Sequence, residues 1–132
     1  MANFLYDDGR EGFLDGSIDW DTDDIRVAAC TSAYVASQSG HKFLSDVTNI
    51  QGTSATLSAP TCTDGIADAA DATYTALSGS AVSQLIIYKH TGTAGTSRLI
   101  AHIDTYTGLP FTPTGGNLVV IWPNGTNKIF KL

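Results

Sequence analysis

The chain has 132 residues, with 7 basic and 13 acidic side chains and a net charge of −6, and this length suits one folded domain. Twelve of the acids are Asp and one is Glu. Together with abundant Thr, Ser and Gly, this composition favours turns and strands and all but excludes a helix bundle. The acidic balance argues against broad nucleic-acid binding, and no apolar run approaches the roughly 18 residues of a membrane-spanning helix.

The negative charge is concentrated at the start of the chain. Residues 1–24 hold eight acids and one base, Arg10, whereas residues 25–132 hold five acids and six bases. We therefore expect a single domain, 1–132, in which an acidic N-terminal segment, 1–24, precedes a nearly neutral β body, 25–132. We expect that a chain lacking residues 1–20 binds its partner less tightly, while the β body still folds.

The N-terminal segment is expected to contain one short helix. Phe13 and Ile18 fall near helical spacing, and the acids that precede them are suited to capping the start of a helix. The pattern predicts a helix over residues 8–16, which Gly9 and Gly12 weaken because glycine has a low helix propensity.

The remainder of the sequence reads as short strands separated by turns. The expected strands cover residues 25–30, 54–59, 72–77, 82–90, 98–104, 117–122 and 128–132. In the strand 98–104, simple alternation puts Leu99, Ala101 and Ile103 on one face. Asn124 and Gly125 are typical of a tight turn between the last two strands. Six or seven such strands predict a mostly β fold, an antiparallel β-sandwich or small barrel with one short N-terminal helix.

Two acidic clusters are candidates for cation binding on spacing alone. The first is Asp19, Asp21, Asp23 and Asp24. It places acids at positions 1, 3 and 5 of a calcium loop but lacks the Gly of position 6, and Cys30 stands where the bidentate Glu of position 12 is required. The second is Asp64, Asp68 and Asp71. Both patterns are typical of solvated loops, and we expect no metal ion and no cofactor.

Catalytic motifs are missing from the sequence. His41, His90 and His102 are well separated, and only His102 has an acid, Asp104, on the same strand face. The chain has no GxSxG elbow, HExxH pair, P-loop or GxGxxG motif. We therefore expect that the protein is not an enzyme.

The two cysteines, Cys30 and Cys62, leave two interpretations open. In a reducing cytosol they remain small semi-buried thiols, whereas after release from a cell they can form one disulfide that closes a loop of about 30 residues. A zinc site is not expected, because no CxxC or paired His spacing accompanies them.

The N-terminal segment is the best candidate for binding a partner. Its acids are suited to steering association with a basic surface, and Trp20 is expected to be exposed among them and to anchor an interface. Trp122, which ends an apolar strand, is expected to pack in the interior. The candidate partner-binding residues are Phe4, Leu5, Asp15, Asp19, Trp20, Asp21 and Asp23.

Several stretches of the chain are similar to sequences of known proteins. They are GREGFLDGSIDW at 9–20, DIRV at 24–27, FLSD at 43–46, GIADA at 65–69, LIIYK at 85–89, LIA at 99–101 and WPNGTNKIF at 122–130. In these stretches the chain resembles a family of small proteins encoded by tailed bacteriophages, among them virion structural proteins. The resemblance covers most of the chain, includes no motif that carries chemistry, and supplies no catalytic residue.

The resemblance implies a component of the virion, and size and β content suit a capsid decoration or cement protein. Such a protein binds the major capsid protein, or other virion proteins, on the outside of the shell, as a homo-oligomer for which a trimer is the candidate state. The alternatives are a tail, baseplate or fibre component, and a non-virion protein that acts in the infected host cell. No nucleic-acid or membrane partner is expected. Because the N-terminus lacks a secretory signal, we expect synthesis in the host cytoplasm. The resemblance implies a final place in the virion, on the capsid exterior.

Overall fold

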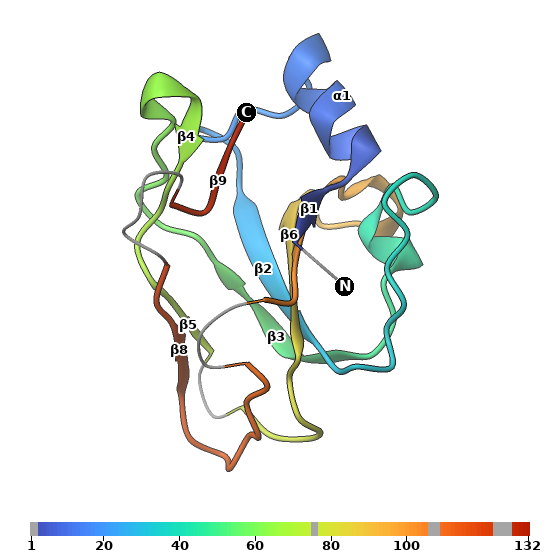
Figure 1. The fold of residues 1–132 in the computed structure, drawn as a ribbon, viewed down its shortest axis with the longest axis vertical. Helices are drawn as coiled ribbons and strands as arrows, with labels where there is room; N and C mark the ends of the chain where they lie inside the picture. Colours follow the sequence, from blue (N-terminus) through green and yellow to red (C-terminus); the bar gives the residue numbers. More distant parts are fainter. Residues whose placement is uncertain (1–2, 75–76, 106–108, 123–127) are drawn as a thin grey trace.

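The structure is a computed structural model that describes residues 3–74, 77–105, 109–122 and 128–132 (Figure 1). It is mostly β, with antiparallel sheets and one short α-helix near the N-terminus, as the sequence predicts. Five strands form the main sheet in the order β1-β7-β6-β2-β3. Their bounds are β1 Phe4–Leu5, β7 Leu99–Ile103, β6 Gln84–Lys89, β2 Ile25–Cys30 and β3 Ile50–Thr56. Two smaller sheets pair β4 (Ile66–Ala67) with β9 (Phe130–Lys131) and β5 (Ala72–Tyr74) with β8 (Leu118–Val120).

The two central strands, β2 and β6, are apolar along nearly their whole length. They pair antiparallel from Ile25 opposite Lys89 to Cys30 opposite Gln84. Val27 belongs to a core on one face of the sheet, and its neighbour Ala28 belongs to a second core on the other face. A strand that is buried on both faces needs apolar side chains at consecutive positions, which explains why these two strands are the clearest in the sequence.

The larger core lies between the main sheet and the two small sheets. Tyr74 of β5 and Val120 of β8 belong to it, and the Tyr74 hydroxyl donates a hydrogen bond of 2.6 Å to the Val27 carbonyl oxygen across the layers. Trp122 is 3% exposed, so the prediction that it packs in the interior is confirmed. This layering of sheets is consistent with the predicted β-sandwich.

The smaller core lies under the connection between β2 and β3, which contains the short 3₁₀-helix η1 (Leu44–Asp46). It contains a series of buried polar contacts. The Tyr34 hydroxyl is 2.9 Å from the Tyr6 hydroxyl and 2.9 Å from His41 Nδ1. His102 Nε2 is 2.7 Å from Gln84 Oε1, and the Gln84 amide donates to the Tyr34 carbonyl oxygen at 2.8 Å. These contacts satisfy polar groups that would otherwise destabilise the core.

Helix α1 covers Asp7–Asp15 and ends at Gly16, whose φ of 80° is left-handed, so the predicted helix is confirmed to within one residue. Its glycine content has a packing reason. A Cβ atom on Gly9 would lie 2.6 Å from the Leu99 carbonyl oxygen of β7. Because only a residue without a side chain fits at that distance, Gly9 allows α1 to pack directly on a strand of the main sheet.

The N-terminal segment is part of the sheet and the cores, so the prediction that it stands apart from the β body is wrong. Phe4 and Leu5 of β1 pair with His102 and Ala101 of β7. Tyr6 is fully buried in the smaller core, and two further side chains of the segment belong to the larger one. Local charge made the segment look separate, whereas its apolar residues complete the packing of the whole molecule.

Two strand predictions also need correction. The alternation expected for β7 is wrong because the register shifts between Ile87 and Tyr88 opposite this strand. This bulge turns Leu99 toward the smaller core, while Ala101 lies in the larger one. The strand expected at 54–59 is β3 and begins earlier, at Ile50. The predicted turn at Asn124 and Gly125 lies outside the described residues.

Candidate functional site

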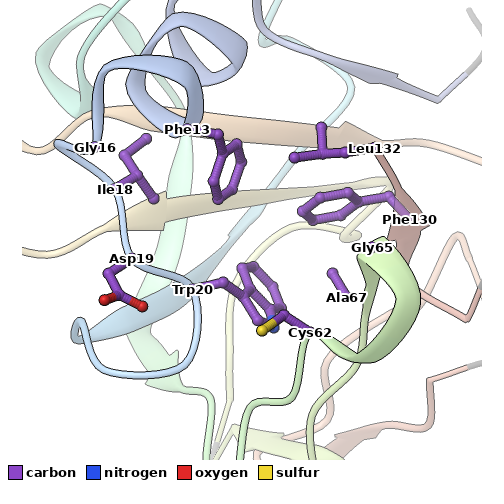
Figure 2. A pocket seen from close by; sticks show the side chains of 10 residues that line it. All are labelled: Phe13, Gly16, Ile18, Asp19, Trp20, Cys62, Gly65, Ala67, Phe130 and Leu132. Atoms are coloured by element: carbon purple, nitrogen blue, oxygen red, sulfur yellow. The ribbon is translucent and has the colours of Figure 1, made fainter.

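An apolar pocket of about 260 Å³ lies where the N-terminal segment meets the end of the chain (Figure 2). Figure 1 shows the C-terminus at the same end of the molecule as α1. The residues that form most of its wall are Phe13, Ile18, Trp20, Cys62, Phe130 and Leu132. We name this feature the N–C pocket. Its walls come from residues more than one hundred positions apart, so sequence reasoning had no local signal for it.

Regular elements hold the aromatic walls of the N–C pocket in place. Phe13 lies near the end of α1, and Phe130 lies on β9, where it pairs with Ala67 of β4. The rings of Trp20 and Phe130 meet edge to face, with centroids 5.2 Å apart, and those of Phe13 and Phe130 are 6.0 Å apart. Figure 2 shows the three rings converging from separate segments. Contacts of this kind give the pocket a fixed shape.

Trp20 is a wall of the pocket, and the prediction that it is an exposed anchor is wrong. Its side chain is only 4% exposed. The indole Nε1 donates a hydrogen bond of 3.2 Å to the Asp68 carbonyl oxygen, which fixes the ring. The neighbouring acids suggested exposure, but Trp20 alternates with them in a turn and its ring points inward.

Six of the eight acids of the N-terminal segment lie within 4.0 Å of a base. Arg98 lies 2.7 Å from Asp8, 3.6 Å from Asp15 and 3.9 Å from Glu11. The other ion pairs of the segment are Asp7 with Arg10, Asp23 with Lys89 and Asp24 with Arg26. Four bases are shared among these six acids, so ion pairing reduces the negative charge of the segment without cancelling it.

Asp19 and Asp21 are the exceptions. Among the described residues, neither has a Lys or Arg nitrogen within 4.0 Å in the ion pairs of this structure. A hydrogen bond between the two carboxyl groups lowers the pKa of Asp19 and raises the pKa of Asp21. Asp19 lines the N–C pocket, and Asp21 Oδ2 accepts a hydrogen bond of 3.8 Å from the Cys62 thiol, which also lines it. Two carboxyl groups without a base partner among the described residues thus lie at the mouth of the pocket.

The two cysteines are free thiols, with Cys30 buried and Cys62 exposed. The charge of Asp21, followed by burial, raises the pKa of the Cys62 thiol. Since the thiolate is the nucleophile, a raised pKa slows the reaction of Cys62 with electrophiles at neutral pH. The sequence left open two free thiols or one disulfide, and in the structure both cysteines are free thiols.

The other four predicted partner-binding residues do not line the N–C pocket. Asp15 is exposed at the end of α1, and Asp23 is half-buried, accepting a hydrogen bond of 2.7 Å from the Asp19 amide. Phe4 and Leu5 are half-buried and line a different pocket, of about 250 Å³. Phe4 stacks on His102 with ring centroids 4.8 Å apart. Asp19, Trp20 and Asp21 are therefore brought together, whereas the two β1 residues are not part of the same site.

In the second candidate cation cluster, two of the three carboxyl groups have other partners. Asp68 forms an ion pair of 3.1 Å with Lys128, and Asp71 Oδ1 accepts a hydrogen bond of 3.1 Å from the Trp122 amide. Within the described ranges, no three His, Cys, Asp or Glu side chains are grouped so that they could hold a metal ion. In the same part of the chain, no helix is long and apolar enough to cross a membrane.

Comparison of the chain with known protein families and with curated proteins finds no match.

Proposed function

We propose that the protein is a virion structural protein of a tailed bacteriophage, a capsid decoration protein that binds the outer shell and stabilises it. The resemblance along the sequence supports the virion class. The observation that supports action by binding is the N–C pocket, an apolar recess with two unneutralised carboxyl groups, Asp19 and Asp21, at its mouth. Protein interfaces combine such apolar recesses with a charged rim.

Binding of modest strength at each pocket is sufficient for this role. Capsid subunits repeat with fixed symmetry, so an oligomeric decoration protein engages several equivalent sites at once. The second and third contacts of a trimer then form at a high effective concentration, and the total affinity greatly exceeds that of one site. The protein would bridge neighbouring capsid subunits and oppose their separation.

The copy number of the protein in purified virions tests this function. We expect mass spectrometry to find copies in a number comparable to that of the major capsid protein. A few dozen copies would instead place the protein in the tail, the baseplate or a fibre, and its absence from particles would leave the role in the infected host cell. Either of these results contradicts capsid decoration.

A charge-matched pair of variants tests the site. The double variant Asp19→Asn, Asp21→Asn removes both carboxylates at the pocket, and Asp7→Asn, Glu11→Gln removes two exposed carboxylates elsewhere in the same segment. We expect the first variant to detach from shells at lower salt than the native protein, and the second to behave like the native protein. Equal losses in both variants would mean that only overall charge matters and would refute a role for the pocket.

A further inference from the structure

We infer that the N–C pocket receives one large apolar side chain from a protein partner, on a segment in which a Lys or Arg lies next to that side chain. The inference rests on the binding role proposed above and deepens it by naming the chemistry of the partner segment. Three observations carry it: the volume of the pocket, the nature of its wall, and the charge at its mouth.

The volume suits a single side chain. The pocket holds about 260 Å³, which is below the roughly 300–1,000 Å³ of pockets that take drug-sized ligands. It is larger than the roughly 150 Å³ cavity that binds benzene in an engineered protein core. The side chain of a Leu, Met or Phe is therefore of a size that the pocket can hold.

The wall of the pocket offers an apolar occupant its best contacts. Aromatic rings form much of the lining, and none of the described lining residues is a Lys or Arg. Leu132, at the edge of the pocket, is 61% exposed, which leaves apolar surface facing water. An occupant would cover the Leu132 side chain and the exposed ring edges together, and burial of apolar area is the main driving force of association.

The mouth of the pocket selects for a cation beside the apolar group. Asp19 lines the pocket, and Asp21 Oδ2 lies 3.8 Å from the thiol of Cys62, another lining residue. Two negative charges at one pocket repel each other when both groups are ionised. The other acids of the segment already have bases of this chain within reach. A guanidinium or ammonium group from outside would relieve the repulsion and form charge-assisted hydrogen bonds with both carboxylates.

The two parts of the site are adjacent, so the two groups of the partner must be adjacent as well. Cys62 lines the pocket, and its thiol also donates to Asp21 Oδ2 at 3.8 Å. In an extended segment, consecutive Cα atoms are about 3.8 Å apart. A base one or two positions from the apolar residue can therefore reach the carboxylates while the apolar side chain occupies the pocket.

Protection of Cys62 from alkylation provides the test on the full-length protein. Cys30 is fully buried, so iodoacetamide added to the folded protein at mildly alkaline pH modifies Cys62. Intact-mass measurements give the rate, and each rate is compared with that of the same protein without peptide. The probes are three capped tripeptides, Lys-Leu-Lys, Lys-Gly-Lys and Glu-Leu-Glu, each titrated into the millimolar range. At twice its dissociation constant, a peptide that covers Cys62 slows alkylation about threefold.

We expect saturable protection by Lys-Leu-Lys alone, and loss of that protection in the Asp19→Asn, Asp21→Asn variant. Equal protection by Lys-Gly-Lys would overturn the apolar requirement, and equal protection by Glu-Leu-Glu would overturn the requirement for a base. Protection that rises with protein concentration alone would overturn the inference by identifying a second copy of this chain as the occupant.

The particle experiments test the proposed function, and the peptide experiments test the inferred chemistry of the partner segment, so the two can fail separately. If none of the tripeptides protects Cys62 but the Asp19, Asp21 double variant still detaches from shells, the chemistry inferred for the partner segment is wrong and the proposed function stands. If Lys-Leu-Lys protects Cys62 but virions lack the protein, the inferred pocket chemistry stands and the proposed function is wrong.

Discussion

The substitution Gly9→Ala tests the packing of α1 on the main sheet, because two opposing effects act on its stability and only the structure shows which is larger. On an isolated helix, alanine is favoured over glycine by about 1 kcal/mol. In the structure, the new Cβ would lie 2.6 Å from the Leu99 carbonyl oxygen and 2.9 Å from the Ile100 Cα. Ordinary contacts between carbon atoms are about 3.5–4.0 Å long, so the helix or the strand must move.

The strand cannot move easily, so we expect Gly9→Ala to destabilise the protein. β7 is paired on both sides, with β1 and with β6, so α1 has to shift outward. That shift weakens the 2.7 Å ion pair between Asp8 and Arg98 and the 2.9 Å hydrogen bond from the Tyr6 amide to the Ile100 carbonyl oxygen. Overpacking of this kind costs about 1–3 kcal/mol or more. We expect a net loss of about 2 kcal/mol in the free energy of unfolding, after the gain in helix propensity.

Urea unfolding followed by circular dichroism measures this loss, and a loss of about 2 kcal/mol lowers the Tm by roughly 6–10 °C in a domain of this size. Gly95→Ala is the matched control. Gly95 lies in the short 3₁₀-helix η3 (Ala94–Thr96) and does not have a positive φ, and a Cβ atom added to it would meet no other atom within 4 Å, so a change below about 0.5 kcal/mol is expected. If Gly9→Ala stabilises the protein, the close approach of α1 to β7 is refuted.

Three further predictions follow from contacts described above. Deleting residues 1–20 should abolish cooperative unfolding, because it removes β1, α1 and buried side chains of both cores; a sharp thermal transition in the truncated chain would contradict this. Arg98→Met should lower the free energy of unfolding by about 3 kcal/mol, because Asp8, whose side chain is 8% exposed, loses its partner. Adding Asp8→Asn to this variant should recover part of the loss. Full additivity of the two substitutions would refute direct coupling between the side chains. Burial lowers the pKa of His102, so the unfolded chain binds a proton more readily than the folded one, and stability should fall as the pH drops below about 6.5 toward the folded pKa. Urea midpoints between pH 7.5 and 5 should show this slope in the native protein and a smaller one in His102→Gln; identical slopes would exclude His102 as the cause.

Sequence patterns predicted the elements whose environment is uniform along the strand. The strand Ile25–Cys30 was predicted with its observed bounds because both of its faces are buried and every position except Arg26 carries an apolar residue. The sequence did not predict which face of the sheet Leu99 occupies. That face depends on a bulge in the pairing of β7 with β6, and the bulge does not change the order of apolar and polar residues along β7. The start of β3 was missed because Gln51 and Gly52 interrupt its apolar pattern.

The candidate site was predicted only in part, for a related reason. Asp19, Trp20 and Asp21 were identified from composition, and they do lie together. Whether each is exposed, however, depends on Phe130, which is distant in sequence and covers Trp20. In the same way, the negative segment looked free of counterions because Arg98, its main partner, lies some ninety residues away. Local reasoning located the charge, and tertiary contacts determined which of it remains available.

The pairing of β1 with β7 constrains the order in which the chain can acquire its structure. Phe4 pairs with His102, so during synthesis β1 cannot pair until β7 has left the ribosome. The β2–β3 pair can form early, but β1 and the residues that follow it have no sheet to join until β6 and β7 emerge. Such non-local pairings make folding slow, on the scale of milliseconds to seconds. During that interval Tyr6 and Trp20 are exposed to solvent, so the step most vulnerable to aggregation precedes the closure of the sheet by β7.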